Sequence, residues 1–176
     1  MKVEEAGSHL DHLLRQTRMH HMELSSMADV KANILLTMSS VVMTLSLRYI
    51  NDPELKVATL ILMVFCLTTI VLATYAVMPH LPFSLKPGNH PDVKSPGFNV
   101  LFFGDFARLR YAEFEAAMEE ILATPSETYG AQVREIYLLG TFLARKKYRF
   151  VRLAYLAFIA GFLTSGSVIL VTAIMV

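Results

Sequence analysis

The sequence predicts an all-α integral membrane protein with three transmembrane helices, at approximately residues 32–50, 57–78 and 153–175, and a small helical cytoplasmic unit. Two observations carry this prediction. Hydrophobic residues make up 54% of the 176-residue chain and charged residues only 18%, which is too apolar a composition for an ordinary soluble domain. The apolar residues are also concentrated in three uncharged runs, each close to the length that crosses a bilayer as a helix.

The first element is a helix over residues 8–31, which is expected to lie in the cytoplasm and to continue into the first span. Leu10, Thr17 and Leu24 recur every seven residues, a spacing that resembles a short, imperfect coiled-coil seam. Neither glycine nor proline separates this segment from the apolar run that follows. Nothing in the sequence therefore ends the helix before the membrane.

The next segment, residues 32–78, is predicted to form a transmembrane hairpin. Its first run, 32–47, has 16 uncharged residues and is about 24 Å long as a helix, slightly short of a ~30 Å hydrocarbon core. Arg48 and Tyr49 can make up the difference, because both side chains reach the membrane interface. The sequence NDPE then predicts a tight turn, and residues 57–78 supply 22 uncharged residues, about 33 Å of helix.

The middle segment, residues 79–152, is predicted to be a cytoplasmic linker followed by two amphipathic helices. Residues 79–97 hold five of the seven prolines, and proline at this density cannot continue a helix. Apolar residues at helical spacing follow over 105–123. The sequence TPSE at 124–127 has an N-cap threonine, a proline at the first helical position and a capping-box glutamate, so a second helix begins there and is expected to lead into the third span.

The third apolar run, residues 153–176, has 24 uncharged residues. Ala157, Gly161 and Ser165 repeat every four positions within it. Small residues at this spacing let a neighbouring helix approach closely. We therefore assign these three residues to helix packing.

Lysine and arginine are distributed unevenly between the segments that flank the spans. Four lie in residues 1–31, two in 48–56 and ten in 79–152. Three spans place the first and the last of these segments on the same side, and their excess of positive charge marks that side as cytoplasmic. We therefore expect the N-terminus and residues 79–152 in the cytoplasm and the C-terminus outside.

The sequence predicts neither an enzyme nor a metal centre. It has no glycine-rich phosphate loop, no Ser-His-Asp pattern and no zinc-hydrolase motif. On the N-terminal helix, His9 and His20 are about 16 Å apart along the axis, too far for one ion with ~2 Å bonds, although a site between neighbouring subunits is conceivable. The single cysteine, Cys66, lies in an apolar run. The net charge of +1 predicts no broad affinity for nucleic acid.

Two polar clusters flank the spans, and each has two interpretations. Asp29, Lys31 and Asn33 form either a collar that anchors the first span or a functional cluster, because an acid and a lysine this close to lipid often pair or bind a ligand. The basic residues within 145–152 either anchor the third span against anionic lipid or, with Arg108 or Arg110, receive a nucleotide phosphate. Spacing alone leaves both alternatives open.

Three local patterns occur in a fixed order: ADVKANILL at 28–36, NVLFFGDFARLRYAEFEAAM at 99–118 and YLLGTFLARKKYRFVRLAYLAF at 137–158. Together with the hairpin and the final span, they resemble the transmembrane effectors of the Pycsar anti-phage defence system. The resemblance extends over roughly residues 8–175, and the order and spacing of the motifs reinforce one another.

The resemblance implies a membrane effector, without a cofactor and without catalytic residues, that acts beside a pyrimidine nucleotide cyclase. Cyclic CMP or cyclic UMP would be the activating ligand, and homo-oligomers in the lipid bilayer would impair the bacterial inner membrane in abortive infection. The residues that we associate with ligand sensing or gating are Asp29, Lys31, Asn33, Asn99, Phe103, Gly104, Arg108 and Tyr148. The alternative is a non-toxic membrane anchor or scaffold that recruits a soluble partner enzyme.

Overall fold

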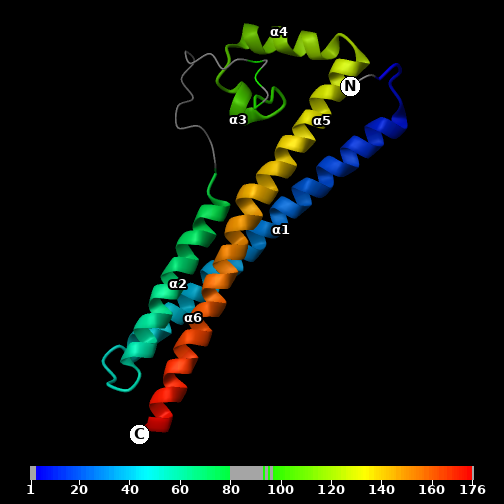
Figure 1. The fold of residues 1–176 in the computed structure, drawn as a ribbon. Helices are drawn as coiled ribbons and strands as arrows, with labels where there is room; N and C mark the ends of the chain where they lie inside the picture. Colours follow the sequence, from blue (N-terminus) through cyan, green and yellow to red (C-terminus); the bar gives the residue numbers. More distant parts are fainter. Residues whose placement is uncertain (1–2, 80–92, 94, 96, 176) are drawn as a thin grey trace. The chain divides into compact units, whose positions relative to one another are not determined.

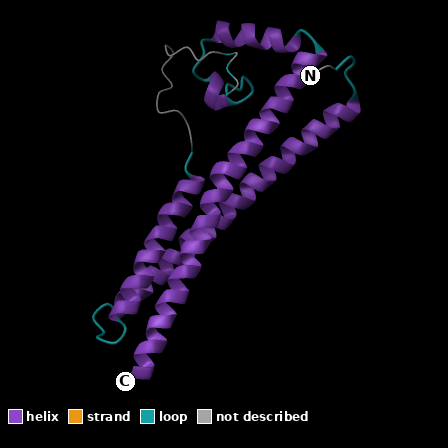
Figure 2. Cartoon of the chain, viewed as in Figure 1, coloured by secondary structure: helices purple, strands orange, loops and turns teal. Residues whose placement is uncertain are grey.

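The computed structural model describes residues 3–79, 93, 95 and 97–175 (Figure 1). Of these described residues, 83% are helical and none lies in a strand (Figure 2). Three of the helical segments are long and apolar enough to cross a membrane. The predicted fold class, an all-α protein with three such segments, is therefore confirmed.

The first helix, α1, runs from Ser8 to Ser46 without interruption and is followed by a short 3-10 helix, η1 (Leu47–Tyr49). Its first turn begins at Gly7, whose carbonyl oxygen accepts hydrogen bonds from the backbone amides of Leu10 and Asp11 at 2.9 and 3.2 Å. No glycine or proline lies within α1, so each interior residue can contribute its backbone hydrogen bond. The polar residues 8–31 and the apolar residues 32–46 therefore belong to one helix.

The second long helix, α2 (Lys56–Val77), follows a turn that Asp52 stabilises. The carboxylate of Asp52 accepts hydrogen bonds from the backbone amides of Glu54 at 3.0 Å and Leu55 at 3.3 Å. These bonds satisfy backbone donors just before the helix, as an Asx turn does. The turn reverses the chain and begins α2.

The remaining helices are α3 (Phe103–Phe106), α4 (Tyr111–Leu122), α5 (Pro125–Phe142) and α6 (Tyr148–Met175). A π-helical segment, η2 (Leu143–Lys147), connects α5 and α6, so the chain is helical from Pro125 to Met175. The start of α5 has the cap that the TPSE sequence predicts: the Thr124 hydroxyl oxygen accepts a hydrogen bond from the Glu127 backbone amide at 3.3 Å.

The chain divides into two compact units. Unit 1 comprises the described residues of 1–23 and 79–143, and unit 2 comprises those of 24–78 and 144–176. Helix α1 contributes to both units, and so does the helical segment from Pro125 to Met175.

Unit 2 has a core of small side chains where helices meet. Ala32, Ala73 and Ala154 are fully buried, and each comes from a different helix: α1, α2 and α6. Helices α2 and α6 lie side by side along much of their length (Figure 1). Small residues suit such a crossing, because in lipid the association of helices depends on close backbone approach rather than on hydrophobic burial.

Unit 1 has a separate core. Phe98, Val100 and Ala117 are buried there, and Leu109 and Phe114 pack against them. The loop before α3 therefore packs on α4, and α4 in turn contacts α5. This arrangement brings the NVLFFGD segment, which the sequence singled out, beside the two amphipathic helices.

Candidate functional site

A polar cluster lies in unit 2 where α1 meets the end of η2. The Lys147 ammonium donates hydrogen bonds to the Ser25 hydroxyl at 2.7 Å and to Asp29 Oδ2 at 2.8 Å. The neighbouring Tyr148 hydroxyl donates to the carbonyl oxygen of Leu24 at 3.0 Å. We call these five residues the boundary cluster, because on both helices they lie where polar sequence gives way to apolar sequence.

The energetics of the boundary cluster depend on the burial of Lys147. Its side chain is only 10% exposed, whereas that of Asp29 is 42% exposed. An ammonium group with so little water needs a charge partner and hydrogen-bond acceptors, and Asp29 and Ser25 supply them. The partial exposure of Asp29 weakens the attraction through solvent screening. The buried lysine therefore requires the pair, while the exposure of Asp29 keeps its net stabilisation modest.

The π-helical segment η2 determines which basic residue enters the cluster. Arg145 and Lys146 of this segment are exposed, whereas Lys147 is buried. A π-helical turn contains more residues than an α-helical one, so it changes which side chain faces a neighbour, and such turns are frequent at functional sites. The segment therefore places Lys147 and Tyr148 against the same stretch of α1.

The structure places the residues predicted at the start of the first span in different surroundings. Asp29 pairs with Lys147 rather than with Lys31, two residues along α1. Lys31 and Asn33 are exposed. Ser25 and Lys147 were not among the predicted site residues, and their signal in the sequence is weak: a serine one turn before an aspartate, and one base among several.

The NVLFFGD segment of unit 1 is organised by Asp105, a residue that the sequence did not single out. Its Oδ2 accepts a hydrogen bond from the backbone amide of Asn99 at 3.0 Å, and its Oδ1 accepts one from the Arg108 guanidinium at 3.2 Å. The side chain of Asn99 accepts a hydrogen bond from the Leu101 amide at 3.0 Å. Two of the predicted residues, Asn99 and Arg108, thus converge on one carboxylate, and the loop has a fixed shape.

Phe103 and Gly104 lie at the start of α3. A Cβ atom on Gly104 would lie 2.4 Å from the ring of Phe102, so only glycine allows the ring to lie there. Phe103 is exposed, and its ring centroid is 4.9 Å from that of Phe102. Gly104 therefore shapes the turn, and Phe103 presents an aromatic surface outside it.

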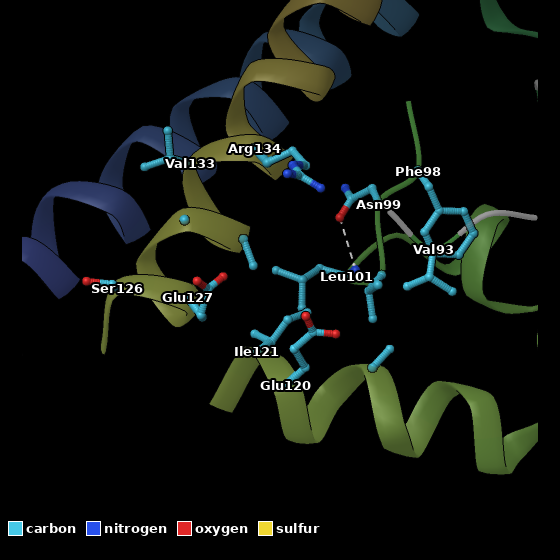
Figure 3. Close-up of a pocket in the computed structure, with 14 residues that line it drawn as sticks. Val93, Phe98, Asn99, Leu101, Glu120, Ile121, Ser126, Glu127, Val133 and Arg134 are labelled. Atoms are coloured by element: carbon cyan, nitrogen blue, oxygen red, sulfur yellow. Dashed lines mark hydrogen bonds between the residues drawn. The ribbon is translucent and has the colours of Figure 1, made fainter. Parts of the chain in front are cut away.

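A cavity of about 480 Å³ lies in unit 1 between this loop, α4 and α5 (Figure 3). Five polar residues line it: Asn99 from the loop, Glu120 from α4, and Ser126, Glu127 and Arg134 from α5. Apolar side chains of the loop and of both helices line the rest. The sequence did not predict this cavity, because its walls come from three segments whose packing no local pattern specifies.

Polar contacts also join the N-terminal part of α1 to α5 within unit 1. The Tyr129 hydroxyl donates a hydrogen bond to Asp11 Oδ1 at 2.6 Å and accepts one from the backbone amide of Gly7 at 3.3 Å. The bond to Asp11, together with burial, raises the pKa of Tyr129 above its ordinary value. Further along the two helices, Arg18 pairs with Glu135 at 3.1 Å.

The three residues assigned to helix packing lie on α6. Gly161 and Ser165 are buried, and Ala157 is partly buried. A Cβ atom on Gly161 would lie 2.6 Å from the Cβ of Phe65 on α2. The backbones of α2 and α6 thus approach closely at this glycine.

The described part of the chain contains no group of three or more histidine, cysteine, aspartate or glutamate side chains arranged to hold a metal ion. The boundary cluster and the Asp105 loop offer ion pairing, hydrogen bonding and ligand contact.

Comparison with known proteins assigns the chain to a family. The family model described as the Pycsar effector protein domain matches residues 12–175. Searches of the curated proteins and of the solved structures gave no match. The matched region includes the boundary cluster, the Asp105 loop and, from residue 12 on, all three candidate spans. The chain belongs to the family of Pycsar effector protein domains.

Proposed function

We propose that this protein is a membrane effector of a bacterial anti-phage system, which responds to cyclic CMP or cyclic UMP by impairing the inner membrane. A neighbouring pyrimidine nucleotide cyclase would make the nucleotide on infection, and loss of the membrane barrier would stop phage production by abortive infection. Membership of the Pycsar effector family is the observation that carries the proposal.

The connectivity of the helices supports a link between sensing and membrane action. Helix α1 contains residues of both units, and so does the helical segment from Pro125 to Met175. A change in the packing of unit 1 can therefore reach the spans through two helices without an intervening flexible loop. The proposal places unit 1 in the cytoplasm, in accord with the excess of lysine and arginine in the segments before and between the spans.

The boundary cluster is suited to act as the switch. An effector needs an element with two arrangements whose balance a ligand can shift. In the described arrangement Lys147 is held by Ser25 and Asp29. In the proposed active arrangement α6 moves against α1, the Lys147 pair separates, and homo-oligomers of the spans disturb the bilayer.

Vesicle leakage tests this function directly. The purified full chain is reconstituted into liposomes filled with a self-quenched dye, and release is measured with cyclic CMP, cyclic UMP or cyclic AMP at micromolar concentration. We expect release with a pyrimidine nucleotide, little with cyclic AMP, and none from protein-free vesicles. Sealed vesicles under both pyrimidine nucleotides, with correctly inserted protein, would contradict the proposal.

A membrane anchor for a soluble partner enzyme is the second candidate function. The observation that favours it is the absence of charged residues from 57–78 and 153–176, since ionisable residues inside spans commonly mark ion pathways. An anchor leaves the membrane potential intact when it is overproduced together with an active cyclase. An effector collapses the potential under the same conditions.

A further inference from the structure

We propose that the cavity of unit 1 binds the cyclic pyrimidine nucleotide, with the phosphodiester of the nucleotide at Asn99 and Arg134. The inference rests on the proposed function, because that function supplies the ligand. The cavity volume of about 480 Å³ lies within the ~300–1,000 Å³ typical of small-molecule sites.

Asn99 is a buried residue whose side-chain amide provides a hydrogen-bond donor at the cavity. The residue is only 7% exposed, and its Oδ1 accepts the Leu101 amide at 3.0 Å. This bond fixes the orientation of the side-chain amide, so Nδ2 is turned away from Leu101 and toward Arg134 (Figure 3). Nδ2 donates to none of the residues that the structure describes. An amide donor without a protein acceptor, fixed in a cavity wall, is suited to a ligand oxygen.

Arg134 provides a positive charge on the same side of the cavity. It extends from α5 toward Asn99 (Figure 3). Within the described residues no carboxylate forms an ion pair with it. A planar guanidinium can bond two phosphate oxygens at once. Asn99 and Arg134 together therefore match the two unesterified oxygens of a cyclic phosphodiester.

The two carboxylates of the cavity set the orientation of the ligand. Glu120 and Glu127 lie on the other side of Leu101 from Asn99 and Arg134 (Figure 3). They repel an anion, so the phosphodiester is favoured only beside Arg134. They can accept hydrogen bonds from the ribose hydroxyl or from the N–H groups of a pyrimidine base.

Apolar side chains supply a surface for the base. Phe98, Val100 and Leu101 of the loop and Ile121 of α4 are among the apolar residues that line the cavity. Such walls, with a few convergent polar groups, are typical of small-molecule sites. The cavity thus offers a cationic group for the phosphodiester, apolar walls for the base, and acceptors for the ribose hydroxyl or the N–H groups of the base.

Gly130 allows the cavity to be filled without disturbing its walls. It lines the cavity from α5, and a Cβ atom added there meets nothing within 4 Å. Gly130→Leu should therefore place a side chain in the ligand volume, whereas Gly130→Ala should leave most of that volume open. Both changes favour the helix, because glycine is a poorer helix former than either residue.

Ligand binding by the full chain in lipid nanodiscs tests the proposed site. Calorimetry with cyclic CMP and cyclic UMP is run on the wild type, Gly130→Leu, Gly130→Ala and Arg134→Gln, with cyclic AMP and inorganic phosphate as comparison ligands. We expect Arg134→Gln to weaken nucleotide binding ~10-fold or more, the loss expected for a hydrogen bond to a charged group. Gly130→Leu should weaken it at least as much, because its side chain occupies the ligand volume. Gly130→Ala should bind nearly as the wild type does.

Two controls separate a local effect from general damage. Gly166→Leu introduces the same side chain on α6, where an added Cβ also meets nothing within 4 Å. Arg149→Gln removes an exposed charge from α6. Both should retain binding, and all variants should keep the helical circular dichroism of the wild type.

The outcomes distinguish the site from the function. Wild-type affinity in Gly130→Leu and Arg134→Gln, with nucleotide-triggered leakage retained, would overturn the site and leave the proposed function standing. A wild type that neither binds nor leaks with either pyrimidine nucleotide would overturn both. Binding of inorganic phosphate as tight as that of the nucleotides would overturn a nucleotide site.

Discussion

In unit 2, α1, α2 and α6 meet through fully buried alanines and a glycine, whereas in unit 1 the N-terminal part of α1 meets α5 through hydrogen bonds and an ion pair. The difference follows from the solvent. Helices in lipid gain little from burying apolar surface, so they need close backbone contact. In each of these polar contacts one partner, Asp11 or Arg18, is exposed, so solvent weakens the interaction.

This difference suits the proposed division of labour between the units. Tight packing of small residues tolerates few alternative arrangements, since interiors are densely packed. Weak polar contacts open locally at low cost, as is typical of ligand-binding regions. Under the proposed function, the ligand rearranges unit 1, and the close packing of unit 2 holds the spans together. The boundary cluster is the polar exception within unit 2.

The largest expected effect is on the packing of unit 2. Gly161→Leu forces a side chain into the space of Phe65, whose Cβ lies 2.6 Å from the position of an added Cβ. We expect a loss of about 3 kcal/mol of stability, at the upper end for overpacked cores, measured by thermal unfolding in detergent. Gly166→Leu, in open space on α6, should change stability little. Equal stability of the two variants would show that α2 and α6 do not pack at Gly161.

The next effect is on the boundary cluster. Asp29→Ala leaves the buried Lys147 ammonium without its charge partner, which we expect to cost about 1–2 kcal/mol, because Asp29 is itself partly exposed. The variant should insert into the membrane normally but lose nucleotide-triggered leakage. Glu23→Ala, which removes an exposed carboxylate from α1 six residues earlier, is the matched control.

A double-mutant cycle sharpens this test. Lys147→Met removes the charge and keeps much of the apolar stem, so Asp29→Ala should have little further effect on stability in that background. Additive losses in the double variant would contradict a direct interaction between Asp29 and Lys147.

A smaller effect is expected in the loop of unit 1. Asp105→Ala removes the acceptor for the Asn99 amide and the Arg108 guanidinium, which should cost about 1 kcal/mol, as expected for hydrogen bonds of partly exposed groups. Helix content should remain near that of the wild type, while cyclic nucleotide binding should weaken because Asn99 is no longer held. Unchanged binding would separate the loop from the ligand site.

The smallest effect concerns the contact between α1 and α5. The raised pKa of Tyr129 means that its neutral form is favoured in the folded protein. The stability it contributes is therefore present below its ordinary value of 10.0 and is lost as the pH rises through the folded value. The stability difference between wild type and Tyr129→Phe should shrink above pH ~10. A difference that grows with pH would contradict the hydrogen bond from Tyr129 to Asp11.

The sequence predicts the fold class well because its signals are local. Uncharged runs, a proline-rich linker and a TPSE cap each specify an element without knowledge of its neighbours. Asp29 also has a local signal, a charge next to an apolar run. Its partner has none, because several bases lie within 145–152 and the π-helical segment determines which of them turns inward.

The residues that the sequence did not reveal make long-range contacts. Asp11 and Tyr129 are 118 positions apart, and no spacing rule connects them. The cavity is formed by a loop and two helices whose packing depends on the core around Phe98. Asp105 is closer in sequence to its partners. However, an aspartate in the first turn of a helix is common, because it interacts favourably with the helix dipole, so its position does not indicate these hydrogen bonds.

The central claim is that a cyclic pyrimidine nucleotide causes this protein to impair the membrane. The most direct test is the membrane potential of bacterial cells that express the chain, measured with a potential-sensitive dye, together with either an active or a catalytically inactive pyrimidine nucleotide cyclase. We expect the potential to collapse only with the active cyclase, and to stay intact with the active cyclase in the Asp29→Ala variant. A potential that stays intact with the active cyclase and abundant membrane-inserted protein would contradict it.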